Sequence, residues 1–182
     1  MLFRSIEPGS CFAGTLAEIP FACDRAYMFS GRMQESNLPE ATLTLSALNF
    51  GRYPMSNGIT RLETRFLGEP ESVGRAKANV GKALDASDAD SLGLVTESFD
   101  QVDWDDEVRI FLEERASFSA DGLTGLEANL RFAGPETMET KIFGRLTAWQ
   151  NWIFQRPNAV GEKGALMTYG REGRPSFDFK RT

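Results

Sequence analysis

The first two dozen residues constrain the fold of this chain more than any other stretch. Residues 2–6 indicate a β-strand, residues 7–10 interrupt it, and a turn at Gly14 leads into a helical segment that ends near Asp24. A glycine turn at a helix N-terminus can direct backbone N–H groups toward an oxygen that gains negative charge. Such a turn normally lies deep inside a domain, whereas here it follows a single strand. We therefore expect an α/β fold with a candidate site close to Met1 in the sequence.

The composition of the 182 residues excludes several classes of function. The formal net charge of −6 argues against a nucleic-acid partner, because phosphate binding requires a basic face. No apolar run approaches the ~20 residues that span a bilayer, and no charged and apolar leader opens the chain, so we expect neither a membrane partner nor secretion. The two cysteines, Cys11 and Cys23, match no metal or redox spacing, which favours the reduced cytoplasmic compartment.

The chain contains no histidine. This excludes Ser-His-Asp and Cys-His catalysis from within the chain, and it argues against a zinc or non-haem iron site, since most such sites use imidazole. We expect no metal and no resident cofactor. Any chemistry must come from carboxylates, hydroxyls, a thiol or backbone amides.

The sequence predicts two regions, residues 1–102 and residues 103–182. The first alternates short strands with turns and short helices. Its expected strands cover residues 24–29, 41–45 and 94–96, and its expected helices cover residues 59–67 and a segment beginning at Pro70. The second region is helical, with one helix over residues 104–118 that Asp105 would cap, another over residues 123–132, and a long one from residue 134.

The long helix carries an apolar stripe. Its members recur at steps of four and three, which place them on one helical face, and Phe143 and Trp152 widen it. The stripe consists of Met138, Ile142, Leu146, Trp149 and Ile153. We expect a core or oligomer-interface role rather than a cofactor site, and the two tryptophans favour an interface. The interface residues predicted from this pattern are Trp149, Trp152 and Ile153.

Three separated segments resemble the crotonase superfamily, the enoyl-CoA hydratases and isomerases. The first is the strand, the Gly14 turn and the helix after it. The second is the turn from Asn49 to Gly58 that leads to Arg61-Leu62, and the third is the small-residue segment over residues 81–95. Their order and spacing together carry the resemblance, which covers roughly residues 2–110.

Further details resemble the benzoyl-CoA-dihydrodiol lyase family within that superfamily. They are residues 7–15, the turn over residues 49–55 and the tryptophan-rich stretch over residues 143–161. The last is absent from ordinary hydratases and is the most specific of the three. Proteins of this family are longer than other superfamily members, and the resemblance is to their C-terminal part.

The resemblance implies a partial crotonase-like ββα spiral over about residues 2–100, truncated at its N-terminus, followed by helices that include a long dimerisation helix. It implies a cytoplasmic carbon–carbon lyase of benzoate degradation. Such an enzyme opens ring-oxidised (epoxy or dihydrodiol) benzoyl-CoA to 3,4-dehydroadipyl-CoA semialdehyde and formate. The coenzyme A thioester is then a substrate and not a cofactor. The family's catalytic glutamates and assisting thiol lie in the N-terminal half, so the implied partners are that missing half and a second copy, in a homodimer.

Glu18 falls where hydratases of the superfamily carry one of two catalytic glutamates. A carboxylate pair allows one member to take a proton while the other positions water. The position of the second glutamate lies near Ala47, which can do neither, and Glu40 falls in an extra loop. Glu18 is thus either a catalytic carboxylate or a helix carboxylate bonded to a neighbouring turn.

Gly14, Thr15 and Cys11 also allow two interpretations each. The N–H groups of Gly14 and Thr15 could supply one oxyanion donor to a thioester carbonyl, worth ~3 kcal/mol, or the turn could serve packing alone. The packing interpretation is preferred, because Thr15 replaces the glycine of many relatives, and because Pro20 would cost ~3 kcal/mol inside the following helix unless the helix bends or Pro20 lies in its first turn. Cys11 could be a nucleophile or base if its pKa were lowered, although a small buried apolar residue is the expected role.

Three functional hypotheses remain. The first is the C-terminal part of a ring-cleaving lyase, inactive alone and supplying scaffold and dimer contacts. The second is a stand-alone enoyl-CoA hydratase or isomerase that uses Glu18. The third is an assembly module without catalytic activity.

Overall fold

The computed structural model describes residues 3–130 and 136–178, and the chain divides into two compact units, residues 2–112 and 113–182. The first unit is α/β and the second is helical, so the expected fold class is confirmed in outline. The partial spiral, the dimerisation helix and the division at residue 102 stay predictions. Element ends expected at residues 2, 132 and 134 lie outside the described residues. Within the described part, no helix is long and apolar enough to cross a membrane.

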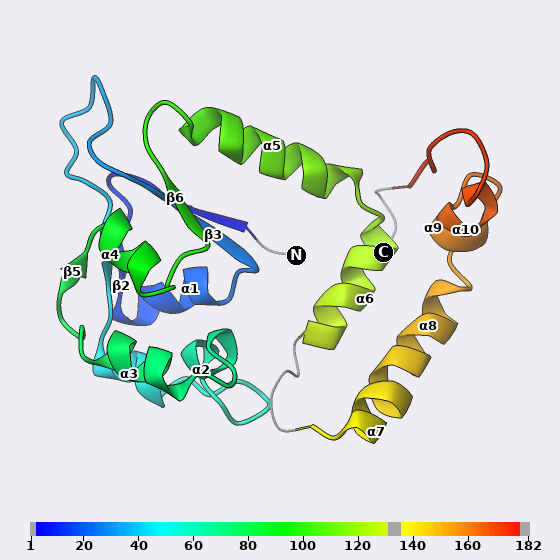
Figure 1. Ribbon diagram of the computed structural model, residues 1–182, viewed down its shortest axis with the longest axis horizontal. Coiled ribbons are helices and arrows are strands. Elements are labelled where there is room, and N and C mark those ends of the chain that lie inside the picture. The colour runs from blue at the N-terminus through cyan, green and yellow to red at the C-terminus, as the bar shows by residue number, and fades with distance from the viewer. Residues whose placement is uncertain (1–2, 131–135, 179–182) are drawn as a thin grey trace. The chain divides into compact units, whose positions relative to one another are not determined.

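Two small sheets form the first unit (Figure 1). One sheet has the order β1-β3-β6 with every pair parallel, and Phe3 of β1 lies opposite Arg25 of β3. The other has the order β2-β4-β5, in which β2 and β4 are parallel and β5 is antiparallel to β4. The strands are β1 (Phe3–Ile6), β2 (Phe12–Ala13), β3 (Arg25–Phe29), β4 (Leu43–Thr44), β5 (Ala83–Leu84) and β6 (Glu97–Phe99). The chain alternates between the two sheets at first, because β1 is followed by β2 and β3 is followed by β4.

Strand β3 is buried on both faces, which explains its nearly continuous apolar sequence. Its Met28 joins the main core, while Tyr27 and Phe29 point to the opposite face, as the two-residue period of a strand requires. There α5 (Trp104–Ser117) covers the sheet. The ring centroid of Phe111 lies 5.7 Å from that of Tyr27, and Trp104 lies 5.4 Å from Phe29.

The main core collects side chains from both sheets and from the short helices around them. Those helices are η1 (Gly14–Ala17), α1 (Glu18–Phe21), η2 (Ala47–Phe50), α2 (Arg61–Arg65), α3 (Pro70–Lys77) and α4 (Ala86–Ser91). Its fully buried large members include Ile6, Met28, Leu43, Leu45, Leu62, Leu84 and Leu94. Transfer of these side chains from water is the main contribution to the stability of this unit.

Sequence signals placed several element ends correctly. Helix α3 begins at Pro70, where a residue without an N–H costs nothing, and Pro20 lies in the first turn of α1 for the same reason. Two predictions are wrong. The last strand begins at Glu97 and not at residue 94, because Leu94 and Val95 are buried in the core before the strand starts. Asp105 does not cap α5 but lies inside its first turn, since the helix already begins at Trp104.

The second unit is built from α6 (Ala120–Leu130) and a long helical segment that packs beside it (Figure 1). That segment comprises α7 (Met138–Lys141), a π-helical turn η3 (Ile142–Leu146) and α8 (Thr147–Ile153). Two short helices follow, α9 (Pro157–Val160) and α10 (Ala165–Thr168). The expected stop at Arg156-Pro157 is close to the observed one, because α8 ends at Ile153 and Pro157 opens α9.

The π-helical turn changes which residues of the long helix face α6. A π turn holds an extra residue and therefore shifts the helical register. The residues that approach α6 follow at steps of four, three and four, and they are Arg145, Trp149, Trp152 and Arg156. The predicted stripe is consequently split, because Met138, Ile142 and Leu146 are 68%, 37% and 54% exposed. A core role for these three residues within the chain is therefore wrong.

Candidate functional site

The Gly14 turn lies where the sequence predicted it, between β2 and the helical segment η1. Gly14 has a φ of +53°, in the left-handed region that glycine adopts without strain. A Cβ at this position would also lie 3.3 Å from Oγ of Ser46, because the turn that follows β4 comes close to Gly14. Both facts require glycine here, and they fix the direction of the Gly14 and Thr15 backbone.

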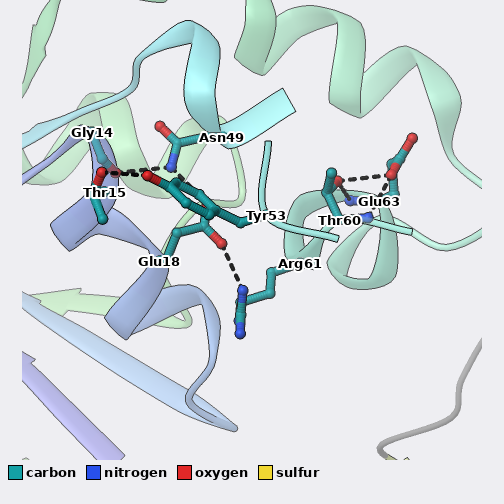
Figure 2. A network of polar contacts seen from close by, with 8 residues as sticks. All are labelled: Gly14, Thr15, Glu18, Asn49, Tyr53, Thr60, Arg61 and Glu63. Carbon is teal, nitrogen blue, oxygen red and sulfur yellow. Dashed lines mark hydrogen bonds and ion pairs between the residues drawn. The ribbon is translucent and has the colours of Figure 1, made fainter. Parts of the chain in front are cut away.

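Glu18 begins α1 one helical turn after Gly14, and its carboxylate is bonded on both oxygens (Figure 2). Oε1 accepts a hydrogen bond of 2.6 Å from Nδ2 of Asn49, and Oε2 accepts one of 2.9 Å from a guanidinium nitrogen of Arg61. The Glu18 side chain is 12% exposed. The carboxylate therefore joins α1 to η2 and α2, as in the interpretation of a helix carboxylate bonded to neighbouring turns.

Asn49 is the centre of this network, although no sequence pattern assigned it a role there. It is 1% exposed, and its two amide hydrogens are donated to the Gly14 carbonyl, at 2.9 Å, and to Glu18. Its amide oxygen accepts from the backbone N–H of Ser46 at 2.9 Å. Because both donors and the acceptor are used, the amide is held in one orientation and the Gly14 turn is held with it.

Tyr53 reaches the turn from the loop after η2. Its hydroxyl lies 2.9 Å from Oγ1 of Thr15, and this pair is exposed to solvent (Figure 2). The hydroxyl pair is thus the accessible polar part of the site, whereas Glu18 and Asn49 lie beneath it. The sequence placed Tyr53 in a family-like turn without indicating this contact.

Arg61 is positioned by a capping box at the start of α2. Oγ1 of Thr60 accepts from the N–H of Glu63 at 3.2 Å, while the Glu63 carboxylate accepts from the N–H of Thr60 at 2.6 Å. The Thr60 hydroxyl also donates to the Glu63 carboxylate at 2.8 Å. The bond from the Thr60 backbone N–H and, less strongly, the one from its hydroxyl lower the pKa of Glu63 below its usual 4.5. The Thr-x-x-Glu spacing is a sequence signal that would have located this helix start and hence Arg61.

Neither of the two positions that the sequence suggested for a second carboxylate, Ala47 and Glu40, supplies one to Glu18. Ala47 is the exposed first residue of η2, beside Ser46. Glu40 is exposed in the polar loop and pairs with Arg32 at 3.7 Å. Acid–base catalysis by a pair of carboxylates requires two such groups, and of the positions predicted from the sequence only Glu18 supplies one at this site. Its carboxylate is hydrogen-bonded to Asn49 and Arg61.

The cysteines differ from expectation. Cys11 is exposed, so its expected role as a small buried residue is wrong, because β2 begins only after it and turns its side chain out of the core. Cys23 is half-buried, and its Sγ donates to the Ile19 carbonyl at 3.3 Å. Burial and, less strongly, Asp24 raise the pKa of Cys23, which is opposite to the shift that a nucleophilic thiol needs. Among residues 3–130 and 136–178, no cluster of three His, Cys, Asp or Glu residues could hold a metal ion.

The predicted interface residues lie on α8. The rings of Trp149 and Trp152 form an edge-to-face pair with centroids 5.3 Å apart. Together with Thr124 and Ala148 they line a pocket of about 500 Å³. Ile153 is half-buried beside them.

Polar contacts lie beside the two tryptophans, where Arg156 reaches α6. The Arg156 guanidinium stacks 5.0 Å from the Trp152 ring centroid, and its Nε donates at 3.0 Å to Asp121, which is 1% exposed. The two tryptophans thus fix the α6–α8 packing as well as presenting an aromatic pocket.

Comparisons with known proteins give one relative at high identity. The chain is 54% identical over 180 residues to benzoyl-CoA-dihydrodiol lyase of Aromatoleum evansii, a match that covers 99% of this chain and 32% of the lyase. The chain therefore spans about a third of the length of that relative. No protein-family model matches the sequence.

Solved structures show the same fold at low identity. An enoyl-CoA hydratase of Geobacillus kaustophilus superimposes with a TM-score of 0.64 at 17% identity, covering 91% of this chain and 58% of that one. The enoyl-CoA hydratase of Bacillus anthracis gives 0.63 at 16% identity over the same shares. That of Mycobacterium smegmatis gives 0.59 at 14% identity, over 96% of this chain and 59% of that one.

Proposed function

Taking the chain as a homologue of part of benzoyl-CoA-dihydrodiol lyase with the fold of the enoyl-CoA hydratases, we propose that it is one part of a carbon–carbon lyase acting on ring-oxidised benzoyl-CoA. The 54% identity over 180 residues carries this proposal. The products proposed are 3,4-dehydroadipyl-CoA semialdehyde and formate. This part supplies scaffold and subunit contacts, and residues outside its sequence supply the catalytic groups. The two free thiols agree with the cytoplasmic location that we propose.

The state of Glu18 supports a scaffold role. Both oxygens of Glu18 accept bonds, from Asn49 and from the Arg61 guanidinium, and the side chain is 12% exposed, as in a carboxylate that holds short elements together. The Gly14 and Thr15 amides are at most one half of an oxyanion site, and the geometry favours their packing role, since Asn49 binds the carbonyl of the same turn. The stand-alone hydratase hypothesis thus gains no support from the site.

The two sheets offer edges for the partner part of the lyase. Within the described residues, β1 pairs only with β3 and β2 pairs only with β4, so β1 and β2 each have one free edge, as β6 and β5 do at the opposite ends of the two sheets. Unpaired strand edges are templates for further strands. We propose that a crotonase-like segment of the same enzyme adds parallel strands at β1 and β2. A second copy of the chain is the other proposed partner, through the helical unit.

A chimera tests the proposal directly. In the Aromatoleum evansii lyase, the matching third is replaced by this chain, and formate release from ring-oxidised benzoyl-CoA is measured. We expect activity in the chimera and none in this chain alone or in the lyase without that third. A chimera that has the circular dichroism spectrum and oligomeric mass of the parent lyase but releases no formate would contradict the assignment. Formate release by this chain alone would instead restore the stand-alone enzyme hypothesis.

A further inference from the structure

One buried side chain of α9 holds the tail of the described chain. Asn158 is 5% exposed, and its amide group binds the backbone of Asp178 twice. Nδ2 donates to the Asp178 carbonyl at 3.2 Å, and Oδ1 accepts from the Asp178 N–H at 2.8 Å. Without these two bonds, a buried donor and a buried acceptor would lose their partners, which is costly. The position of Asn158 therefore favours a peptide backbone bound against it.

A further bond lies on the same edge of the tail. The Ser176 N–H donates to the Lys163 carbonyl at 3.0 Å. In an extended segment, the backbone groups of residues i and i+2 point to the same side, and the bonds of Ser176 and Asp178 have this spacing. Phe177 lies between them and is half-buried. The pattern is that of a peptide added to a strand edge, with the Asn158 amide in the place of one peptide group of the strand.

Two glycines shape the loop that receives the tail. A Cβ at Gly161 would lie 2.6 Å from the Pro157 carbonyl oxygen, and one at Gly164 would lie 2.7 Å from the Ala159 carbonyl. Glycine is therefore needed for the loop between α9 and α10 to fold back so tightly. The N–H of Gly161 donates to Pro157 and the N–H of Gly164 donates to Gly161, both at 2.8 Å. The loop is thus fixed by its own bonds, and the Lys163 carbonyl accepts from the tail.

These contacts define the kind of peptide that fits. The bonds from Asn158 and Lys163 reach backbone atoms, which are common to all residues, although proline lacks the N–H. Selectivity is left to the half-buried Phe177 side chain. We propose that residues 158–164 form a docking site for an extended peptide with an apolar residue at its centre, and that residues 176–178 of the same chain occupy it. Only residues 169–175 separate α10 from the bound segment, so the tail is held at a high effective concentration.

Hydrogen exchange tests the proposal without reference to lyase activity, so either proposal can fail alone. The exchange rates of single amides are measured by NMR in the full 182-residue chain. We expect the Ser176 and Asp178 amides to exchange at least about tenfold slower than the same amides in a free peptide. An unprotected Ser176 amide in the native chain would overturn the proposal.

A pair of variants at Asp178 separates its backbone from its side chain. Asp178→Pro removes the bonded N–H, and the Ser176 amide should then exchange at the free-peptide rate. Asp178→Ala keeps both backbone groups and is the matched control, in which the Ser176 amide should stay within about threefold of its native rate. Equal exchange rates in the two variants would contradict recognition through the backbone.

Asn158→Ala tests the other side of the contact. We expect it to abolish the protection of both tail amides, whereas Asn151→Ala, at an exposed position of α8, should leave their protection unchanged. Protection that survives Asn158→Ala in a folded chain would exclude the role of this amide. If Asn158→Ala unfolds the helical unit, the two Asp178 variants still decide, because they alter the tail alone.

A peptide added in trans tests whether the site accepts a second segment. An amidated peptide with the sequence of residues 173–178 is titrated to roughly 5 mM against the side-chain amide signals of Asn158. We expect shifts in the Asp178→Pro chain, whose own tail is released, and much smaller shifts in the native chain, whose tail competes. The control peptide carries proline in place of its last residue and should cause no shift. No shift with the first peptide in the Asp178→Pro chain, or equal shifts with both peptides, would overturn the docking site.

Discussion

Nδ2 of Asn49 lies 2.6 Å from Oε1 of Glu18, and the same amide group donates to the Gly14 carbonyl. One buried side chain thereby joins the glycine turn, the start of α1 and η2. The turn and the glutamate that resemble a hydratase site are thus joined by one amide, which links short elements that have little helical stability of their own.

Removal of the Asn49 amide is expected to destabilise the first unit strongly. Asn49→Ala leaves Glu18, the Gly14 carbonyl and the Ser46 N–H without this partner in a buried place. We expect the free energy of unfolding to fall by about 2–4 kcal/mol, measured by urea denaturation with hydrogen exchange in residues 3–112 as the local readout. Asn37→Ala, at an exposed loop position, should change it by less than about 0.5 kcal/mol. Equal effects of the two substitutions would show that the Asn49 hydrogen bonds contribute nothing to the free energy of unfolding.

Glu18→Gln separates a structural carboxylate from a catalytic one. In the chimeric lyase, we expect formate release to stay within about threefold of the parent chimera, whereas loss of a general base typically costs about 10²–10⁴-fold. The melting temperature should fall, because the Arg61 guanidinium loses its anionic acceptor. A loss of activity by two orders of magnitude in a folded variant would return Glu18 to the active site.

The capping box makes the stability of α2 depend on pH. Because the folded-state pKa of Glu63 is lowered, its contribution is fully present above the unfolded value near 4.5 and is lost as the pH falls through the folded value. Glu63→Ala removes the acceptor of the Thr60 N–H and should cost about 1 kcal/mol at pH 7, and its difference in stability from the native chain should shrink below pH 4.5. The midpoint of urea denaturation, measured over a pH series, checks this prediction. Glu172→Ala, at an exposed tail position, should show no such convergence.

The two thiols should differ in reactivity. Cys11 is exposed, while burial raises the pKa of Cys23 and reduces its thiolate at pH 8. We expect iodoacetamide to modify Cys11 at least about tenfold faster than Cys23. Mass spectrometry of the peptides measures the two rates. Cys11→Ser should remove the fast phase and leave the slow one. Faster modification of Cys23 would mean that the 19–23 turn opens readily in solution.

Several local elements could be predicted from the sequence. Pro70 marked the start of α3, residues 24–29 marked a strand, and Gly14 marked the turn that only a residue tolerant of positive φ can make. That the strand is buried on both faces became clear only from the structure. These signals are local, because they depend on the backbone preferences of one residue or on a short hydrophobic period.

The contacts of the candidate residues could not be predicted in this way. Arg61 lies 43 residues from Glu18 in sequence, and no local pattern shows that the two form an ion pair of 2.9 Å. The apolar stripe of the long helix was visible, but the π-helical turn that rotates Arg145 inward and Leu146 outward was not. Sequence periodicity assumes a regular helix and near neighbours, whereas side-chain pairing and exposure depend on which distant segments the fold brings together.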